Sequence, residues 1–382
     1  MSVRSIALWP LTAAIATALI GLPCWSQEST RQEFEVDLGG WQVFELRFDG
    51  TPAQPSATLD ITAEPADVKT GIGALRFAYE AEKGALRAAV LGEPALAGMR
   101  SLRFWIKSST ATPVLVQLRE RDESEYAIAA LLPAGKWQRV AVNLADLWLD
   151  ENSMDENGGL DTDQVATIAL ADVAPLFAML ADAAPELAGL FPVELGLRQL
   201  VIDDFELSPE TVPELHPTRQ TADGIELTID SFDSGMVMWL PFGGAVAEVV
   251  QQAPGESYLR LRHEAKPFAG LMTPLVQGIS LEGLQRISLR VQSSVDCVLA
   301  VSLEERDDSR YSASVVLKGS EEWQTLTVTP QRFKLDDDSE DENAQLDVGA
   351  LKNLTLADVS GLIGLTGPRT LLVDDVVALV AR

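Results

Sequence analysis

The residue types that enzymes most often use for nucleophilic or acid–base chemistry are scarce in this sequence. It has two histidines, His216 and His263, and two cysteines, Cys24 and Cys297. They give no Ser-His-Asp or Cys-His pairing and no histidine-based metal motif, and the chain has no glycine-rich phosphate loop. Cys297 lies in an apolar run, which predicts a buried structural thiol. We therefore expect a protein that is not an enzyme.

Carboxyl groups are the exception, because they are plentiful. Glu120 and Asp122 recur as Glu305 and Asp307 in the second half of the chain. A pair of carboxyl groups is what a glycosidase needs. A polysaccharide hydrolase therefore stays a third alternative for the function.

Two acidic loops, residues 150–163 and 336–347, carry the hard oxygen ligands that calcium prefers. The spacing Asp155-x-Asn157-x-Gly159 nevertheless lacks the third oxygen ligand and the closing glutamate of an EF-hand loop. We expect both loops to be solvated, with their like charges repelling one another.

Two neighbouring segments, 102–107 and 114–119, alternate apolar and polar residues with the period of a β-strand. One side of each faces the core, and we expect the opposite sides to form one sheet face that presents Arg103, Trp105, Lys107, Gln117 and Arg119. An indole stacks on a pyranose ring while polar groups bind its hydroxyls, so this face is a candidate glycan site. The alternative is that Trp105 packs under the N-terminal segment or an inserted helix.

An internal repeat relates the segments of the first half of the chain to matching segments in the second half. Residues 116–122 recur as 301–307, Trp137-Gln138 recurs as Trp323-Gln324, and each copy closes on a pair of aspartates in an apolar strand. At the positions of the candidate glycan face the second copy has no aromatic residue, and Arg290 replaces Trp105. We therefore expect only copy one to bind a glycan.

Short alternating segments separated by turn residues predict antiparallel β-sandwiches. We predict an all-β chain with two tandem sandwich domains, residues 33–208 and 225–382, joined by a proline-rich linker at 209–224. Copy one has a Leu/Ala-rich stretch at about 175–196 that copy two lacks, and its spacing predicts a helical insert.

The order of motifs resembles a known family. It runs through Gly71–Arg76, Leu102–Ser108, Gly135–Val142 and Ile202–Phe205. This order is similar to the galactose-binding-like jelly roll, as in family 11 carbohydrate-binding modules and the complex I intermediate-associated family. The resemblance covers about 33–208 and, more weakly, 225–382. It implies an accessory, non-catalytic domain, in a fold that hosts glycan binding, protein binding and structural roles.

The resemblance also implies one structural calcium ion between the first and last strands of a domain. The matching ligands are Asp203 or Asp204 and Asp374 or Asp375. One aspartate of each pair must point towards the core, where a carboxylate is costly unless it is neutralised. An arginine or backbone amides are the alternatives to the ion.

The net charge and the N-terminal segment indicate which partners and which cellular location to expect. The formal net charge is −28, which disfavours nucleic acid as a partner, so we expect none, and it fits cations or neutral ligands. Residues 1–26 combine Arg4, an apolar run and a polar follow-on, which predicts a signal peptide, with an uncleaved anchor as the alternative. No later segment predicts a transmembrane helix.

These observations predict a secreted or periplasmic, non-catalytic binding protein whose copy one binds a polysaccharide or other glycan. The alternative is a structural or protein-interaction role with an envelope protein as partner and no small ligand.

Overall fold

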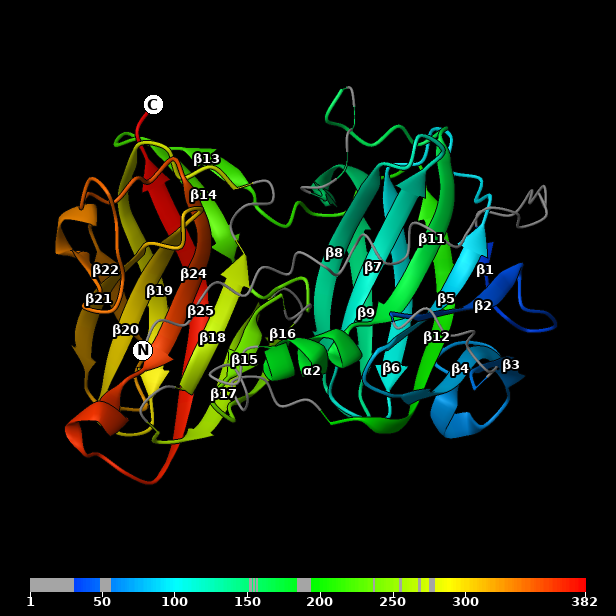
Figure 1. Cartoon of the computed structure of the whole chain (residues 1–382), viewed down its shortest axis with the longest axis horizontal. Helices are drawn as coiled ribbons and strands as arrows, with labels where there is room; N and C mark the ends of the chain where they lie inside the picture. The colour runs from blue at the N-terminus through cyan, green and yellow to red at the C-terminus, as the bar shows by residue number, and fades with distance from the viewer. Residues whose placement is uncertain are drawn as a thin grey trace. The chain divides into compact units, whose positions relative to one another are not determined.

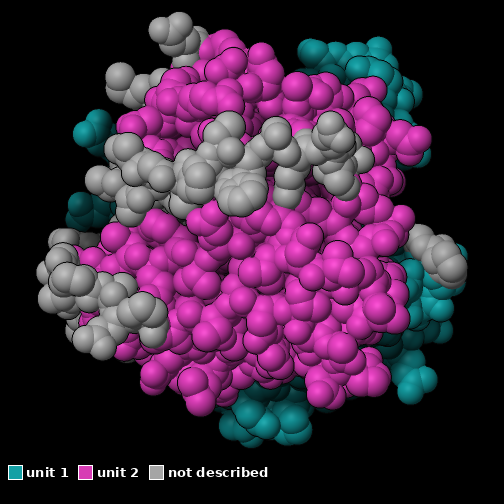
Figure 2. All heavy atoms as spheres, turned by 90° about the vertical axis from the view of Figure 1, so that its right-hand side faces the viewer, with its two compact units in different colours: residues 1–5, 186–192, 215–382 teal, residues 6–185, 193–214 magenta. Residues whose placement is uncertain are grey.

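The computed structural model describes residues 31–48, 56–150, 153, 155, 157–183, 194–235, 238–253, 256–266, 269–274 and 279–382. The predicted signal peptide lies outside them. The described residues up to Glu214 form one compact unit, and those from Leu215 onwards form the other. Figure 2 colours the N-terminal unit magenta and the C-terminal unit teal. No helix among the described residues is long and apolar enough to span a membrane.

The N-terminal unit consists of two antiparallel sheets (Figure 1). The first has the order β3 (Thr58–Thr62), β4 (Ala74–Ala81), β12 (Gly196–Ser208), β6 (Ser101–Ser108) and β9 (Trp137–Asn143), with β1 (Arg31–Gln32) paired to β12. The second has the order β10 (Trp148–Leu149), β8 (Glu125–Leu132), β7 (Thr112–Glu120), β11 (Val165–Asp172), β5 (Ala85–Gly92) and β2 (Trp41–Arg47). Helix α2 (Ala174–Ala183) packs on β5 and β7.

The C-terminal unit repeats this architecture. Its first sheet contains β13 (Thr218–Gln220), β14 (Ile225–Asp230), β25 (Pro368–Val380), β17 (Glu256–Glu264), β16 (Val246–Ala253), β19 (Leu284–Ser293) and β22 (Gln324–Val328). Its second contains β15 (Leu240–Phe242), β18 (Ala269–Pro274), β24 (Leu351–Asp358), β20 (Cys297–Glu305), β21 (Arg310–Leu317) and β23 (Lys334–Leu335). Short 3₁₀ turns complete the two units: η1 (Pro65–Asp67), η2 (Leu144–Asp146), η4 (Pro330–Arg332) and η5 (Ser360–Ile363).

Both units are jelly rolls by their strand order. In the N-terminal unit β4-β12-β6-β9 lies in one sheet and β5-β11-β7-β8 in the other. In the C-terminal unit β17-β25-β19-β22 and β18-β24-β20-β21 repeat that order strand for strand. Consecutive strands therefore exchange sheets repeatedly, as two Greek keys require. The prediction of an all-β chain with two antiparallel sandwiches is confirmed.

The hydrophobic core of each unit lies between its two sheets. It is formed by the apolar side chains at alternate positions of the strands. Leu102, Phe104 and Ile106 of β6 are buried, while Arg103, Trp105 and Lys107 between them are partly exposed.

Of the predicted insert at 175–196, α2 accounts for the described first part, and residues 184–193 lie outside the described residues.

The chain between the units is held at both ends. Ser101 donates a hydrogen bond to the Glu210 carbonyl at 2.7 Å, and the Val212 amide donates to Asn143 at 2.9 Å. Further on, β13 pairs with β14 in the C-terminal unit.

Candidate functional site

The glycan face expected on copy one is not assembled. Strands β6 and β7 lie in opposite sheets, so their outward sides point away from each other. Arg103, Trp105 and Lys107 face outward from one sheet, whereas Gln117 and Arg119 belong to the other sheet and are buried there. The expectation that the two strands share a face was wrong, because a jelly roll sends these consecutive strands to different sheets.

Trp105 lies beneath the connection between β3 and β4, residues 63–73. The Lys69 ammonium is 4.1 Å from the centroid of the Trp105 ring. Lys107 pairs with Asp67 of the same connection and lies 5.2 Å from the ring centroid of Trp137. The cover is therefore this connection, because the inserted helix α2 packs on strands of the other sheet.

The aspartate pair of copy one is neutralised by the protein itself. The amides of Lys69 and Thr70 donate to Asp203 Oδ2 at 2.7 and 2.8 Å, and the Thr70 hydroxyl donates to Oδ1 at 3.2 Å. Asp204 adopts a positive φ of 53° at a β-bulge and pairs with Arg31 of β1 at 2.7 Å. Amides and an arginine thus occupy the role expected of calcium at Asp203 and Asp204.

The aspartate pair of copy two has the same bulge but fewer partners. Asp375 has a φ of 47°, and its amide donates to Asp374 Oδ1 at 2.8 Å. One nitrogen of Arg290 lies 3.2 Å from both carboxylates. Burial, followed by the charge of Asp375, raises the pKa of Asp374 to about 6. The connection that corresponds to residues 63–73 is much shorter here, because β16 ends at Ala253 and β17 begins at Glu256.

Two clusters of acidic side chains, one in each copy, could hold a metal ion. In each, one oxygen of each of three carboxyl groups lies within 4.8 Å of the others. Among the described residues, these groups are Glu120, Asp122 and Asp155 in copy one, and Glu305, Asp307 and Asp341 in copy two. Burial and then the nearby charges of Asp122 and Asp155 raise the pKa of Glu120 to about 7. A divalent cation bound there would offset that repulsion.

The described residues of the two acidic loops make side-chain hydrogen bonds that recur in both copies. Asn157 donates to Asp161 at 3.0 Å, and its counterpart Asn343 donates to Asp347 at 3.1 Å. The repeat extends to contacts with the strands. The hydroxyl of Tyr126 donates to Asp155 and that of Tyr311 to Asp341, while the amides of Asp161 and Asp347 donate to Glu120 and Glu305.

A pocket that the sequence did not predict lies on the outer face of the first sheet of the C-terminal unit. Its volume is about 330 Å³. The pocket is lined by Asp233, Gln252, Glu256, Ser257, Tyr258, Arg290, Trp323, Asp374 and Asp375. The rings of Tyr258 and Trp323 meet edge to face with centroids 5.7 Å apart, and the Arg290 guanidinium lies 4.9 Å from the Trp323 centroid.

The aromatic side chains were missed because both residues lie outside the two segments from which the site was predicted. Tyr258 belongs to β17, and Trp323 directly precedes β22. The match of Trp137 with Trp323 was the available signal, since β22 pairs with β19 and so carries Trp323 next to Arg290.

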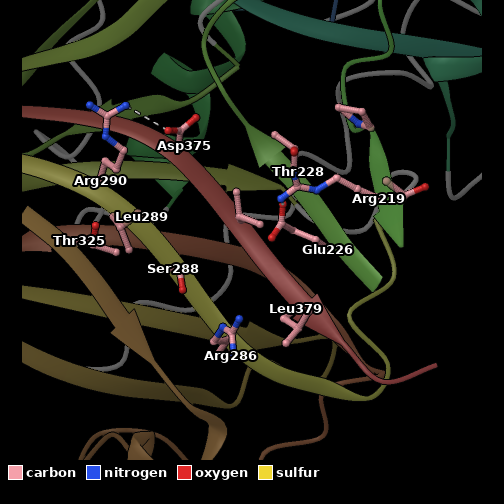
Figure 3. Close-up of a pocket in the computed structure, with 13 residues that line it drawn as sticks. Arg219, Glu226, Thr228, Arg286, Ser288, Leu289, Arg290, Thr325, Asp375 and Leu379 are labelled. Atoms are coloured by element: carbon pink, nitrogen blue, oxygen red, sulfur yellow. Dashed lines mark hydrogen bonds and ion pairs between the residues drawn. The ribbon is translucent and has the colours of Figure 1, made fainter. Parts of the chain in front are cut away.

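A second depression of about 600 Å³ continues from this pocket, because both are lined by Arg290 and Asp375. Figure 3 shows Arg290 directed towards Asp375, with Ser288 and Arg286 farther along β19. Thr228 and Glu226 of β14 stand on the opposite side of β25. The outer face of this sheet thus offers one surface of mixed polar and apolar side chains that begins at the two aromatic rings.

The buried thiol and the buried histidine lie apart from this surface. Cys297 is free and buried, and burial raises its pKa, as expected for a structural thiol rather than a nucleophile. His263 lies 3.0 Å from Asp358 in the interior of the unit.

No protein-family model and no curated protein matches this chain. Solved structures that are similar to it include carbohydrate-binding modules. One is the family 11 module from Clostridium thermocellum in complex with a β-1,3-1,4-mixed-linked tetrasaccharide, at 12% identity and a TM-score of 0.33, covering 47% of this chain and 94% of that one. Another is the tandem of two family 22 modules from Paenibacillus barcinonensis Xyn10C, at 15% identity and a TM-score of 0.29, covering 92% and 97%.

An exo-β-agarase is also similar, at 10% identity and a TM-score of 0.33, and the match covers 41% of this chain and 25% of the enzyme. The jelly-roll assignment of both units rests on their own strand order.

Proposed function

We propose that this chain is an exported, non-catalytic carbohydrate-binding protein whose binding pocket lies on the C-terminal unit. The observation that carries the proposal is the Tyr258–Trp323 pair at the edge of a polar pocket. Sugar sites combine an aromatic surface for the C–H face of a ring with polar groups for its hydroxyls. This pocket supplies both, with the carboxyl, amide and guanidinium groups of Asp374, Gln252 and Arg290.

The location reverses the expectation that copy one binds. In copy one, the connection 63–73 lies over Trp105 and Asp203. In copy two, the equivalent connection is two residues long, and the pocket is present.

The test is a glycan array followed by titration calorimetry with residues 27–382. The Trp323→Ala variant should lose binding, because the aromatic contact is removed. Trp137→Ala is the matched control, since Trp137 is the counterpart of Trp323 in copy one, and it should bind as the unmodified protein does. Loss of binding in Trp137→Ala alone, or no glycan bound by the unmodified protein, would contradict the proposal.

We also propose that calcium is the cofactor and that it binds the two acidic clusters. Three carboxyl groups within 4.8 Å of one another in both copies support this, since calcium prefers hard oxygen ligands.

Export is proposed from the sequence of residues 1–26, and detection of the mature protein outside the cytoplasm would test it. The competing function is binding of an envelope protein to the acidic surface. A pull-down that recovers such a partner without any glycan dependence would favour it.

A further inference from the structure

The pocket beside Trp323 has a surplus of negative charge. Its lining includes the carboxyl groups of Asp233, Glu256, Asp374 and Asp375 and one cationic side chain, Arg290. Arg290 is shared between Asp374 and Asp375. The ligand must enter a site in which carboxyl groups outnumber the positive charges, so a cationic ligand gains electrostatic stabilisation there and an anionic one is repelled.

Copy one shows what satisfies the equivalent position. Asp203, the counterpart of Asp374, accepts two amide hydrogen bonds and one hydroxyl hydrogen bond from Lys69 and Thr70. The ammonium of Lys69 also lies over the indole ring of Trp105. The connection in copy one therefore brings N–H donors, an O–H donor and a positive charge to one carboxylate and one aromatic ring.

Within the part of the chain that the structure describes, Asp374 accepts hydrogen bonds from the Asp375 amide and from the shared guanidinium of Arg290, and from no connection like 63–73. The raised pKa of this half-buried carboxyl group is the electrostatic result, since burial and Asp375 both disfavour its charge. A ligand that carries adjacent N–H and O–H donors would supply what Lys69 and Thr70 supply in copy one.

We infer that the pocket takes a sugar with a free primary amine, so that the ligand is a cationic glycan containing amino sugars. This inference rests on the proposed carbohydrate-binding function. In such a sugar, the ammonium group and a neighbouring hydroxyl donate to Asp374, and the ring contacts the Tyr258–Trp323 pair. Charge-assisted hydrogen bonds of this kind are stronger than those between neutral groups.

The experiment compares two oligosaccharides of equal length on the intact mature protein at about pH 6.5. One is an oligomer of glucosamine, and the other is its N-acetylated form, which has no charge. The glucosamine oligomer should bind about tenfold more tightly, as one charge-assisted hydrogen bond implies. Added salt should reduce the difference. Two variants should each reduce the difference in affinity between the two oligomers. They are Asp374→Asn and, at an exposed position, Glu256→Gln.

The other outcomes separate this inference from the proposed function. Equal or tighter binding of the N-acetylated oligomer overturns the preference for amines and leaves carbohydrate binding in place. Binding of neither oligomer and of no glycan on the array overturns both. Oligolysine that binds as tightly as the glucosamine oligomer, with no loss in Trp323→Ala, shows general attraction of cations and also overturns the inference.

Discussion

At the residue scale, Asp230 links the pH of the solution to the stability of the C-terminal unit. Its carboxyl group accepts hydrogen bonds from the Phe232 amide at 2.7 Å and from Trp239 Nε1 at 2.9 Å. Complete burial nevertheless raises its pKa to about 7. The folded chain therefore holds a proton that the unfolded chain releases near pH 4. Stability should fall as pH rises from about 4 to about 7, because the native state binds more protons in that window.

Asp230→Asn should flatten this part of the pH profile, since the side chain can no longer ionise. The measurement is the melting temperature at a series of pH values. The exposed Asp223→Asn serves as the control and should keep the profile of the unmodified protein. An unchanged slope in Asp230→Asn would show that another group sets it.

The burial of the apolar side of β6 was predictable from the sequence, whereas the burial of Gln117 and Arg119 and the partners of the side chains were not. Alternation placed Leu102, Phe104 and Ile106 in the core, because a strand exposes and buries alternate residues. The cover over Trp105 depends on Lys69, which lies in a connection without a periodic pattern. Nothing local in the sequence states where such a connection folds back.

At the element scale, a buried ion pair ties the two sheets of each unit together. In the N-terminal unit Asp172 of β11 pairs with Arg198 of β12 at 2.9 Å and accepts a hydrogen bond from Tyr79 of β4 at 2.8 Å. In the C-terminal unit, Asp358 meets His263 at 3.0 Å and Arg369 at 3.4 Å. The same position of the jelly roll thus keeps its aspartate and arginine while tyrosine and histidine exchange.

Asp172→Ala should destabilise the N-terminal unit by about 3–5 kcal/mol, because it leaves Arg198 buried without its carboxylate. Urea unfolding measures this. The matched control is Asp60→Ala, which breaks the more exposed pair between Asp60 and Arg76 and should cost at most about 1 kcal/mol. Equal effects of the two substitutions would contradict a structural role for the buried pair.

The elements themselves were foreseen, but their assignment to sheets was not. The segments 102–107 and 114–119 are strands as predicted. Periodicity reports which side of a strand is apolar, and it carries no information on which sheet the strand joins. The predicted site on Arg103, Trp105, Lys107, Gln117 and Arg119 failed at that step.

At the scale of the whole molecule, the duplication acts as an internal comparison. Contacts that both copies keep, such as the acidic loop folded onto Glu120 or Glu305, are shared features of the two domains. Contacts that differ, such as the cover over Asp203 and the pocket beside Asp374, mark where the copies have diverged. The repeat was visible in the sequence, whereas the divergence became visible only in the structure, because it lies in the length and course of one connection.

The shared acidic clusters predict that calcium stabilises both units. A ligand that binds only the folded state adds about 2.7 kcal/mol at a hundredfold excess over its dissociation constant. The melting temperature should therefore rise with calcium and fall with a chelator. Asp122→Asn should remove part of the response, and so should Asp307→Asn, because each withdraws one carboxylate from one cluster. The exposed Asp163→Asn, in the same loop as Asp155, should respond as the unmodified protein does.

The two single variants also decide whether the clusters are equivalent. If both bind, the double variant loses the whole calcium response and each single variant loses a part of it, since the clusters lie in separate units. If one single variant already removes the whole response, only that copy binds the ion. Superimposable melting curves with calcium and with chelator would mean that the carboxylates of both loops are held by their hydrogen bonds alone.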